Sequence, residues 1–277
     1  MDILTFIQQS LIEDLGEGDH TTLSTISHEQ TGKAKLLVKE RGVIAGVELA
    51  QLIFNQVDAD LSIQLFKKDG DLVEVGEIAF IVEGRIQSIL IAERLVLNCM
   101  QRMSGIASVT HELSMILAPF DIQILDTRKT TPLNRMIEKW AVRIGGGVNH
   151  RFGLYDMILI KDNHVDSAGG IKNALAKASA YIKEKSLSIP IEIETRSLAE
   201  ITEALNTGIP DRIMLDNFHP TLIKEAVQLI NGQCKIEVSG GITKENILDY
   251  AIKGVNYISM GALTHSVKSL DLSLKIT

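Results

Sequence analysis

The stretch IPIEIETRSLAEITEALNTGIPDRIMLD (residues 189–216) decides the fold class of this chain. It begins with an apolar run, continues with apolar residues at helical spacing, and ends with a second apolar run, RIMLD (212–216). Short apolar strands that alternate with amphipathic helices are typical of parallel sheets covered by helices. The stretch therefore predicts an α/β fold.

The same unit repeats on both sides of this stretch. The ends of the expected strands, Glu194, Asp216, Ser239 and Met260, are separated by steps of 22, 23 and 21 residues, the length of one strand and one helix. The six expected strands are DIQIL (121–125), MILI (157–160), IPIEIE (189–194), RIMLD (212–216), KIEVS (235–239) and NYISM (256–260). These are too few to close a (β/α)₈ barrel. We therefore expect an incomplete, open parallel α/β barrel.

The first hundred residues lack this repeat. Apolar residues at helical spacing occur in LTFIQQSLIEDL (4–15), which is followed by an expected loop, GEGDHTT (16–22), and in GVELAQLIFNQV (46–57). Strand-like stretches are KAKLLVKE (33–40), LSIQLF (61–66) and IAFIVEG (78–84). This mixture predicts a separate α+β, sandwich-like domain.

One long helix is expected from Ala92 to about Leu117. Gly105 lies inside it and predicts close packing, because glycine weakens the interior of a helix. We place the N-terminal domain at residues 1–105 and the barrel at 106–267. The last residues, 268–277, are candidates to return to the N-terminal domain.

Composition limits the possible functions. The chain has 277 residues, with 28 basic and 35 acidic side chains and a formal net charge of −7. Such a balance is unsuited to general binding of nucleic acid or membranes. The two cysteines, Cys99 and Cys234, are too few for a disulfide framework and lack metal-ligand spacing. Acidic residues near the first residue, where a signal peptide is basic, lead us to expect a cytoplasmic protein.

One segment reverses the overall charge. From Arg128 to His164 there are seven basic residues and three acidic ones, a local net charge of +4 (7 − 3). The basic residues are Arg128, Lys129, Arg135, Lys139, Arg143, Arg151 and Lys161. A concentrated positive patch in an acidic protein suits a small polyanion, although a solvated basic surface has the same composition.

Polar residues and glycines stand at the C-terminal ends of the expected strands, where barrels of this type carry their active sites. Residues 239–241 precede a helix expected from near Thr243, and Gly261 follows the neighbouring strand. Their backbone N–H groups suit a phosphate, although the same glycines also suit tight turns. Glu194 and Asp216 suit Mg²⁺ shared with substrate phosphates, with salt bridges to nearby lysines as the alternative.

The loop EKWAVRIGGGVNHRFGLYD (138–156) adds further candidates. Its three successive glycines let the backbone approach a ligand closely, and Arg143 and Arg151 have guanidinium groups that bind carboxylates in a bidentate way. His150 taken alone is typical of a structural histidine. Its place between the glycines and Arg151 makes it a candidate for contact with the ligand.

Four stretches closely resemble the quinolinate phosphoribosyltransferase family, also called decarboxylating nicotinate-nucleotide pyrophosphorylases. They are DTRKTTP (126–132), EKWAVRIGGGVNHRFGLYDMILIKDNH (138–164), SGGI (239–242) and ISMGALTHS (258–266). Agreement extends to EDLGEGDHTT (13–22), GVIAG (42–46) and ERLVLNCMQRMSGIAS (93–108), so it covers nearly the whole chain. The resemblance implies a dimer or a larger assembly such as a hexamer. It also implies transfer of phosphoribosyl from phosphoribosyl pyrophosphate to quinolinate with Mg²⁺, which gives nicotinate mononucleotide, pyrophosphate and CO₂ for NAD biosynthesis.

The resemblance implies a role for each candidate residue. Quinolinate carboxylates would be bound by Arg102, Arg128, His150, Arg151 and Lys161, with Arg102 supplied by a partner subunit. Lys129 would lie near the pyrophosphate, and Glu194 and Asp216 near Mg²⁺ and the ribose hydroxyls. The remaining substrate-binding residues would be Ser239, Gly240, Gly241, Met260 and Gly261, mostly around the 5′-phosphate. The catalytic residues would be Lys129, Lys161, Glu194 and Asp216.

The chain departs from the family pattern at two places. Leu133 and Asn134 follow Pro132 where Gly-Leu is usual, which puts the local turn in doubt, and Val238 replaces a smaller residue. Three other functions remain open: a transferase of the same fold with another acceptor such as nicotinate, a phosphate-metabolite sensor without turnover, and a carrier domain. The several retained cations favour a dicarboxylate acceptor, because unpaired buried cations are costly.

Overall fold

The computed structural model describes residues 2–277, which form two compact units. Among the described residues, unit 1 comprises 2–111, Pro132–Gly146 and Ser266–Thr277, and unit 2 comprises Glu112–Thr131 and Gly147–His265. Helix α4 (Ile86–Leu117) begins in unit 1 and ends in unit 2, so the expected boundary at residue 105 falls inside it. Across residues 2–277, no helix has the length and apolar character needed to cross a bilayer.

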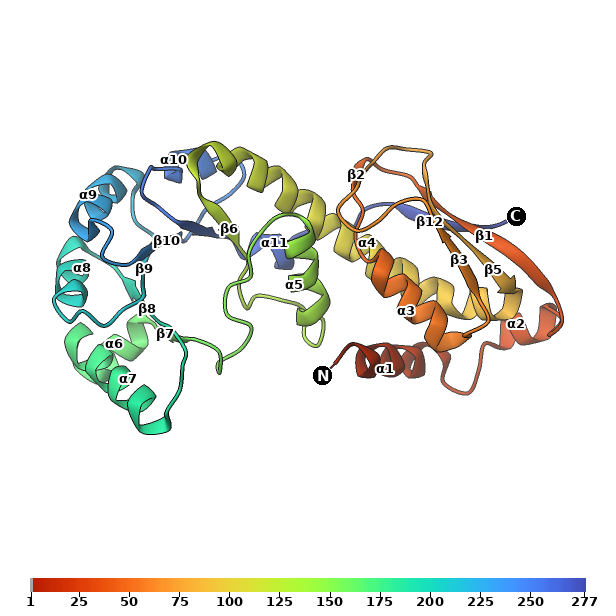
Figure 1. The fold of residues 1–277 in the computed structure, drawn as a ribbon, viewed down its shortest axis with the longest axis horizontal. Coiled ribbons are helices and arrows are strands. Elements are labelled where there is room, and N and C mark those ends of the chain that lie inside the picture. The colour runs from red at the N-terminus through yellow and green to blue at the C-terminus, as the bar shows by residue number, and fades with distance from the viewer. Residues whose placement is uncertain (1) are drawn as a thin grey trace. The chain divides into compact units, whose positions relative to one another are not determined.

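Unit 1 contains an antiparallel sheet with the strand order β12-β1-β5-β3 (Figure 1). Its strands are β1 (Thr31–Val38), β3 (Ser62–Leu65), β5 (Ile78–Arg85) and β12 (Leu272–Ile276), and a small ribbon pairs β2 (Gly42–Val43) with β4 (Leu72–Val73). Its other helices are α1 (Ile3–Leu15), α2 (His20–Thr25), α3 (Val47–Val57) and α5 (Arg135–Ile144). The C-terminal strand β12 thus lies in the same sheet as the N-terminal strands.

The core of unit 1 follows from alternation in the strands. Ala34, Leu36 and Val38 occupy alternate positions of β1 and are fully buried. On α3, the ring of Phe54 packs edge-to-face against Phe80 of β5, with ring centroids 5.9 Å apart. These contacts attach α3 to the sheet.

Two details of unit 1 bear on the sequence expectations. A β-carbon at Gly105 would collide with the carbonyl oxygen of Lys268, which confirms the expected packing reason for this glycine. The loop expected over residues 16–22 is wrong in its second half, where α2 begins at His20. Asp19 explains the difference, because its side chain accepts a hydrogen bond from the Thr22 N–H and caps the helix.

Unit 2 is built on a parallel sheet of six strands in the order β6-β11-β10-β9-β8-β7. The strands are β6 (Gln123–Leu125), β7 (Ile158–Ile160), β8 (Ile191–Thr195), β9 (Arg212–Asp216), β10 (Lys235–Ser239) and β11 (Tyr257–Ser259). Its helices are α6 (Asp162–Ala168), α7 (Ile171–Lys185), α8 (Leu198–Leu205), α9 (Pro220–Ile230), α10 (Ile247–Tyr250) and α11 (Ala262–His265), with a 3₁₀ turn at Ala118–Phe120.

The sheet curves, and α6 to α10 follow its outer side (Figure 1). Strands β6 and β7 lie at its two edges, as the predicted open α/β barrel requires. All six strands occur where the apolar runs placed them. The fold class predicted from the sequence is confirmed, and the C-terminal strand ends meet at one side of unit 2.

Candidate active site

The C-terminal ends of the strands in unit 2 surround a pocket of about 790 Å³. Nearly all of the predicted site residues line it. They are Arg128, Lys129, His150, Arg151, Lys161, Glu194, Asp216, Ser239, Gly240, Gly241, Met260 and Gly261. Arg102 is the exception, because it belongs to unit 1.

Four basic side chains face this pocket, from residues 128, 129, 151 and 161. Burial and the nearby positive charge of Arg128 lower the pKa of Arg151. Cations held close together repel one another, so an anion that enters between them is stabilised. The pocket therefore favours ligands with several negative charges.

Lys161 and Glu194 form an ion pair at the ends of β7 and β8, with Lys161 Nζ 2.5 Å from Glu194 Oε1. Glu194 is nearly buried, with 10% of its side chain exposed. Asp216 ends β9, the strand beside β8, and accepts a hydrogen bond from the amide of Asn217. Carboxylate oxygens from adjacent strands are the hard donors that Mg²⁺ prefers, so these two residues fit the ion.

The glycine turn after β10 differs from its expected form. The helix expected from near Thr243 begins only at Ile247, so that prediction is wrong. Gly240 and Gly241 have positive φ angles of 99° and 62°, and the Thr243 N–H bonds to the side chain of Asn246 instead of opening a helix. Any phosphate here would meet the backbone N–H groups of a turn, without a helix dipole behind them.

A buried carboxylate holds the loops at the pocket. Asp126 is fully buried and accepts hydrogen bonds from the amide of Asn149, at 2.6 Å, and from the backbone N–H of His150, at 2.8 Å. Thr264 donates a hydrogen bond to the carbonyl oxygen of Lys129 at 2.8 Å. These contacts fix where residues 128–129 and 150–151 enter the pocket.

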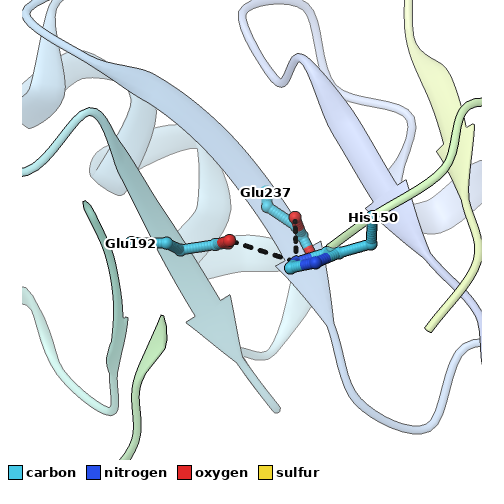
Figure 2. Close-up of side chains that lie close together, drawn as sticks. All are labelled: His150, Glu192 and Glu237. Carbon is cyan, nitrogen blue, oxygen red and sulfur yellow. Dashed lines mark ion pairs between the residues drawn. The ribbon is translucent and has the colours of Figure 1, made fainter. Parts of the chain in front are cut away.

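Two buried glutamates, one of which (Glu237) lines the pocket, were not predicted as site residues. Figure 2 shows Glu192 of β8 and Glu237 of β10 directed at His150. The His150 Nε2 atom lies 3.1 Å from Glu192 Oε2 and 3.3 Å from Glu237 Oε2. The signal was present in the sequence, since IPIEIE and KIEVS each carry an acid inside an apolar strand. The structure shows a buried partner for one of these acids, because the guanidinium group of Arg212 lies 2.8 Å from Glu237.

The charges in this buried group affect one another. Burial and the charge of Glu237 raise the pKa of Glu192 to about 7. Burial also raises the pKa of Glu237, but interactions with His150, Ser259 and Arg212 outweigh it and lower that pKa. Burial lowers the pKa of His150, whereas Glu192 and Glu237 outweigh it and raise that pKa. The protonation of these three residues is therefore coupled.

Arg102 of α4 is held inside unit 1. Its Nε and Nη2 atoms lie 3.1 and 2.9 Å from Glu138 Oε1, and Nη1 donates to the carbonyl oxygen of Val267 at 3.2 Å. Glu138 is fully buried, whereas 23% of the Arg102 side chain is exposed. The guanidinium group is thus held in a fixed direction by its own chain.

Comparison with known proteins identifies the family. Residues 19–104 match the family model "Quinolinate phosphoribosyl transferase, N-terminal domain", and residues 106–275 match the model of its C-terminal domain. The chain belongs to the quinolinate phosphoribosyltransferase family. Together the two models cover most of the chain, so membership does not depend on the pocket alone.

Relatives of this quinolinate phosphoribosyltransferase family member align with nearly the whole of this chain. "Nicotinate-nucleotide pyrophosphorylase [carboxylating], chloroplastic" of Arabidopsis thaliana is 46% identical over 99% of this chain and 83% of its own. The crystal structure of NadC from Streptococcus pyogenes has 40% identity and a TM-score of 0.94, covering 99% of this chain and 97% of that one. The nicotinate-nucleotide pyrophosphorylase structure from Francisella tularensis has 38% identity and a TM-score of 0.92, over 99% and 96% of the two chains.

Proposed function

We propose that this chain transfers phosphoribosyl from phosphoribosyl pyrophosphate to quinolinate, with loss of CO₂, to give nicotinate mononucleotide and pyrophosphate. Membership of the quinolinate phosphoribosyltransferase family supports the reaction and its place in NAD biosynthesis. The observation that carries the proposal is the pocket, which combines four basic side chains with the carboxylates of Glu194 and Asp216 and a glycine turn. Both substrates are polyanions, and this pocket suits two of them side by side.

Quinolinate is assigned to the basic side chains of the pocket. Arg128, Arg151 and Lys161 have the charge and donors to bind two ring carboxylates, and His150 forms part of the same wall. A monocarboxylate such as nicotinate would leave cations in this partly buried group without an anion, which is unfavourable. This charge balance supports a dicarboxylate acceptor.

Phosphoribosyl pyrophosphate is assigned to the glycine turns after β10 and β11. The backbone around Ser239, Gly240 and Gly241, with Gly261 and Met260 on the next strand end, is proposed to hold the 5′-phosphate. A β-carbon at Gly261 would lie 2.9 Å from the side chain of Lys129, so this glycine leaves room for the lysine. Lys129 is then placed to stabilise the leaving pyrophosphate.

Glu194 and Asp216 are proposed to bind Mg²⁺ together with the ribose hydroxyls and pyrophosphate. The ion would neutralise charge on the pyrophosphate as it leaves. Lys161 and Glu194 are paired with each other, and the two substrates offer each of them a new partner of opposite charge. Binding of quinolinate to Lys161 would free Glu194 to accept hydrogen bonds from the ribose.

The chemical steps then follow from these placements. The pyridine nitrogen of quinolinate attacks the anomeric carbon, which has oxocarbenium character as its bond to pyrophosphate breaks. The ring nitrogen becomes positively charged and stabilises the electron pair that stays on carbon 2 when the 2-carboxylate leaves as CO₂. Carbon 2 then takes up a proton. Lys129 and Lys161 act by fixed charge in both steps, so the decarboxylation needs no further organic group.

We also propose that the active enzyme is a homo-oligomer in which Arg102 enters the pocket of a partner subunit. The fixed direction of its guanidinium, set by Glu138, supports a binding role for an arginine outside the pocket of unit 2. The size of the assembly, dimer or hexamer, and the cytoplasmic location stay predictions.

The test is an assay of the purified protein with quinolinate, phosphoribosyl pyrophosphate and Mg²⁺, following nicotinate mononucleotide and CO₂. Nicotinate serves as the parallel acceptor, and a chelator followed by added Mg²⁺ tests the metal. Product and CO₂ from quinolinate alone, lost with the chelator and restored by Mg²⁺, are expected. Turnover of nicotinate, or of neither acceptor, would contradict the proposal.

A further inference from the structure

A layer of charged side chains crosses the interior of unit 2, and its Glu237 and His150 also line the pocket. Glu192 on β8 pairs in register with Arg212 on β9, and Glu237 on β10 pairs with Tyr257 on β11. The guanidinium group of Arg212 lies 2.8 Å from Glu237, 3.7 Å from Glu192 and 4.2 Å from the centre of the Tyr257 ring. Both glutamates are fully buried, so their charges must be balanced inside the protein.

Arg212 balances one of the two carboxylates. The remaining negative charge lies against Nε2 of His150, at 3.1 Å from Glu192 and 3.3 Å from Glu237 (Figure 2). A metal ion is the other way to balance such a group, because ligand atoms of these three residues lie within 4.8 Å of one another. The guanidinium of Arg212 already supplies a cation beside Glu237, so the geometry favours an N–H of the imidazole as the partner of the carboxylates.

The other side of the imidazole leads into the pocket. The backbone N–H of Arg151 donates a hydrogen bond to His150 Nδ1 at 2.7 Å. The backbone N–H of His150 is held by Asp126 at 2.8 Å. The two ring nitrogens thus connect the buried carboxylates to the peptide group from which the Arg151 side chain enters the pocket.

We propose that Glu237 and Glu192 are positioning residues for the acceptor: they orient the His150 imidazole, which in turn fixes the peptide N–H of Arg151. This inference rests on the proposed function. It assigns His150 a positioning part, because its ring nitrogens are directed at protein groups and the quinolinate carboxylates are left to the arginines and lysine. Glu192 and Glu237 act on the acceptor through His150, although Glu237 also borders the pocket.

The test is a kinetic double-mutant cycle with Glu237→Gln, His150→Gln and the double variant. Glu237→Gln is expected to raise the KM for quinolinate about tenfold and to change the KM for phosphoribosyl pyrophosphate less than about twofold. In the His150→Gln background the same change is expected to have an effect of less than about twofold, since the residue it acts through is gone. Glu184→Gln, which removes an exposed carboxylate paired with Lys185, is the matched control and should change neither KM.

Glu237→Gln leaves Arg212 without its closest carboxylate, so this variant can misfold. Glu192→Gln provides a second test of the inference that does not depend on Glu237→Gln. Arg212 lies 2.8 Å from Glu237 and 3.7 Å from Glu192, so replacement of Glu192 keeps the closer Arg212–Glu237 pair. It should raise the KM for quinolinate in the same selective way. The inference would be overturned if the KM changes of Glu237→Gln and His150→Gln multiplied in the double variant. Equal increases in the KM for both substrates would also overturn it. So would a metal ion that is bound by the wild-type protein and lost in Glu237→Gln. The wild-type assay tests the proposed function separately, because it needs only product formation.

Discussion

Leu133 has a backbone conformation that glycine adopts more easily. Its φ angle is +66°, it follows Pro132, and its side chain is 78% exposed. Proline followed by a residue with positive φ is the pattern of a type II turn, which favours glycine at this place. The departure from the family's usual glycine therefore leaves the turn intact and places strain on the leucine.

Leu133→Gly is expected to stabilise the protein relative to Leu133→Ala. A β-carbon in the left-handed region costs the folded state about 1–2 kcal/mol. Replacement by glycine removes this cost, but the greater freedom of glycine in the unfolded chain lowers the stability by about 0.5–1 kcal/mol. The glycine variant should therefore have a free energy of unfolding about 0.5–1 kcal/mol above that of the alanine variant. Urea unfolding of both variants measures the difference, and equal stability would show that residue 133 carries no strain.

The glycine turn after β10 provides a prediction about an element. A β-carbon at Gly240 would collide with the side chain of Asn217, whereas one at Gly208, which also has positive φ, would meet no atom within 4 Å. Gly240→Ala is expected to raise the KM for phosphoribosyl pyrophosphate at least about tenfold, the scale of a lost hydrogen bond to a charged group. Gly208→Ala should cost about 1 kcal/mol in stability and leave both KM values unchanged. Steady-state kinetics of the pair decides, and a similar KM for both variants would remove the turn from the binding site.

Asp58 joins three elements of unit 1. Its carboxylate follows α3, forms an ion pair with Arg85 of β5 at 2.8 Å, and accepts a hydrogen bond from Ser88 of α4 at 2.7 Å. Burial raises the pKa of Asp58, but the bonds from Ser88, the Asp60 N–H and Arg85 outweigh it and lower that pKa. A carboxyl group with a lowered pKa stabilises the fold above its ordinary pKa, and this contribution is lost as the pH falls below that value.

Asp58→Asn is therefore expected to lower the free energy of unfolding by about 1–3 kcal/mol near pH 7. The difference from wild type should shrink as the pH falls below about 4, where the wild-type carboxyl group becomes protonated. Urea unfolding at several pH values measures it. A difference that stays constant down to about pH 3 would mean that the charge of Asp58 contributes nothing.

Local sequence patterns were sufficient for the strands of unit 2 and insufficient for some of its turns. Six apolar runs predicted β6 to β11, because a strand covered on both faces needs a continuous apolar stretch. The predicted helix start near Thr243 was wrong. The backbone N–H of Thr243 donates a hydrogen bond to the side chain of Asn246, which forms a turn there, and the helix begins only at Ile247. Glu192 and Glu237 were missed as site residues because their partners, Arg212 and His150, come from other segments of the chain.

At the scale of the whole molecule, the chain passes between the two units several times. Pro132–Gly146 belongs to unit 1, although the sequence on both sides of it forms unit 2. Helix α5 of this segment carries Glu138, which holds Arg102. The spacing of apolar residues in the sequence predicts which residues are buried, but it does not predict which unit they pack against. The same limit applies to Arg102, whose proposed role requires a second copy of the chain.

Mixing two inactive variants tests whether sites are shared between subunits. Arg102→Ala changes unit 1 and Lys161→Ala changes the pocket of unit 2, so each variant alone is expected to lose most activity. In a symmetric dimer whose pocket uses the partner's arginine, a mixed dimer has one complete site and one site that lacks both groups. Random exchange of equal amounts should thus restore about a quarter of the wild-type activity. The control is the same mixture without subunit exchange. Activity no higher than that of either variant after exchange, verified by native mass spectrometry, would mean that Arg102 serves its own chain or none.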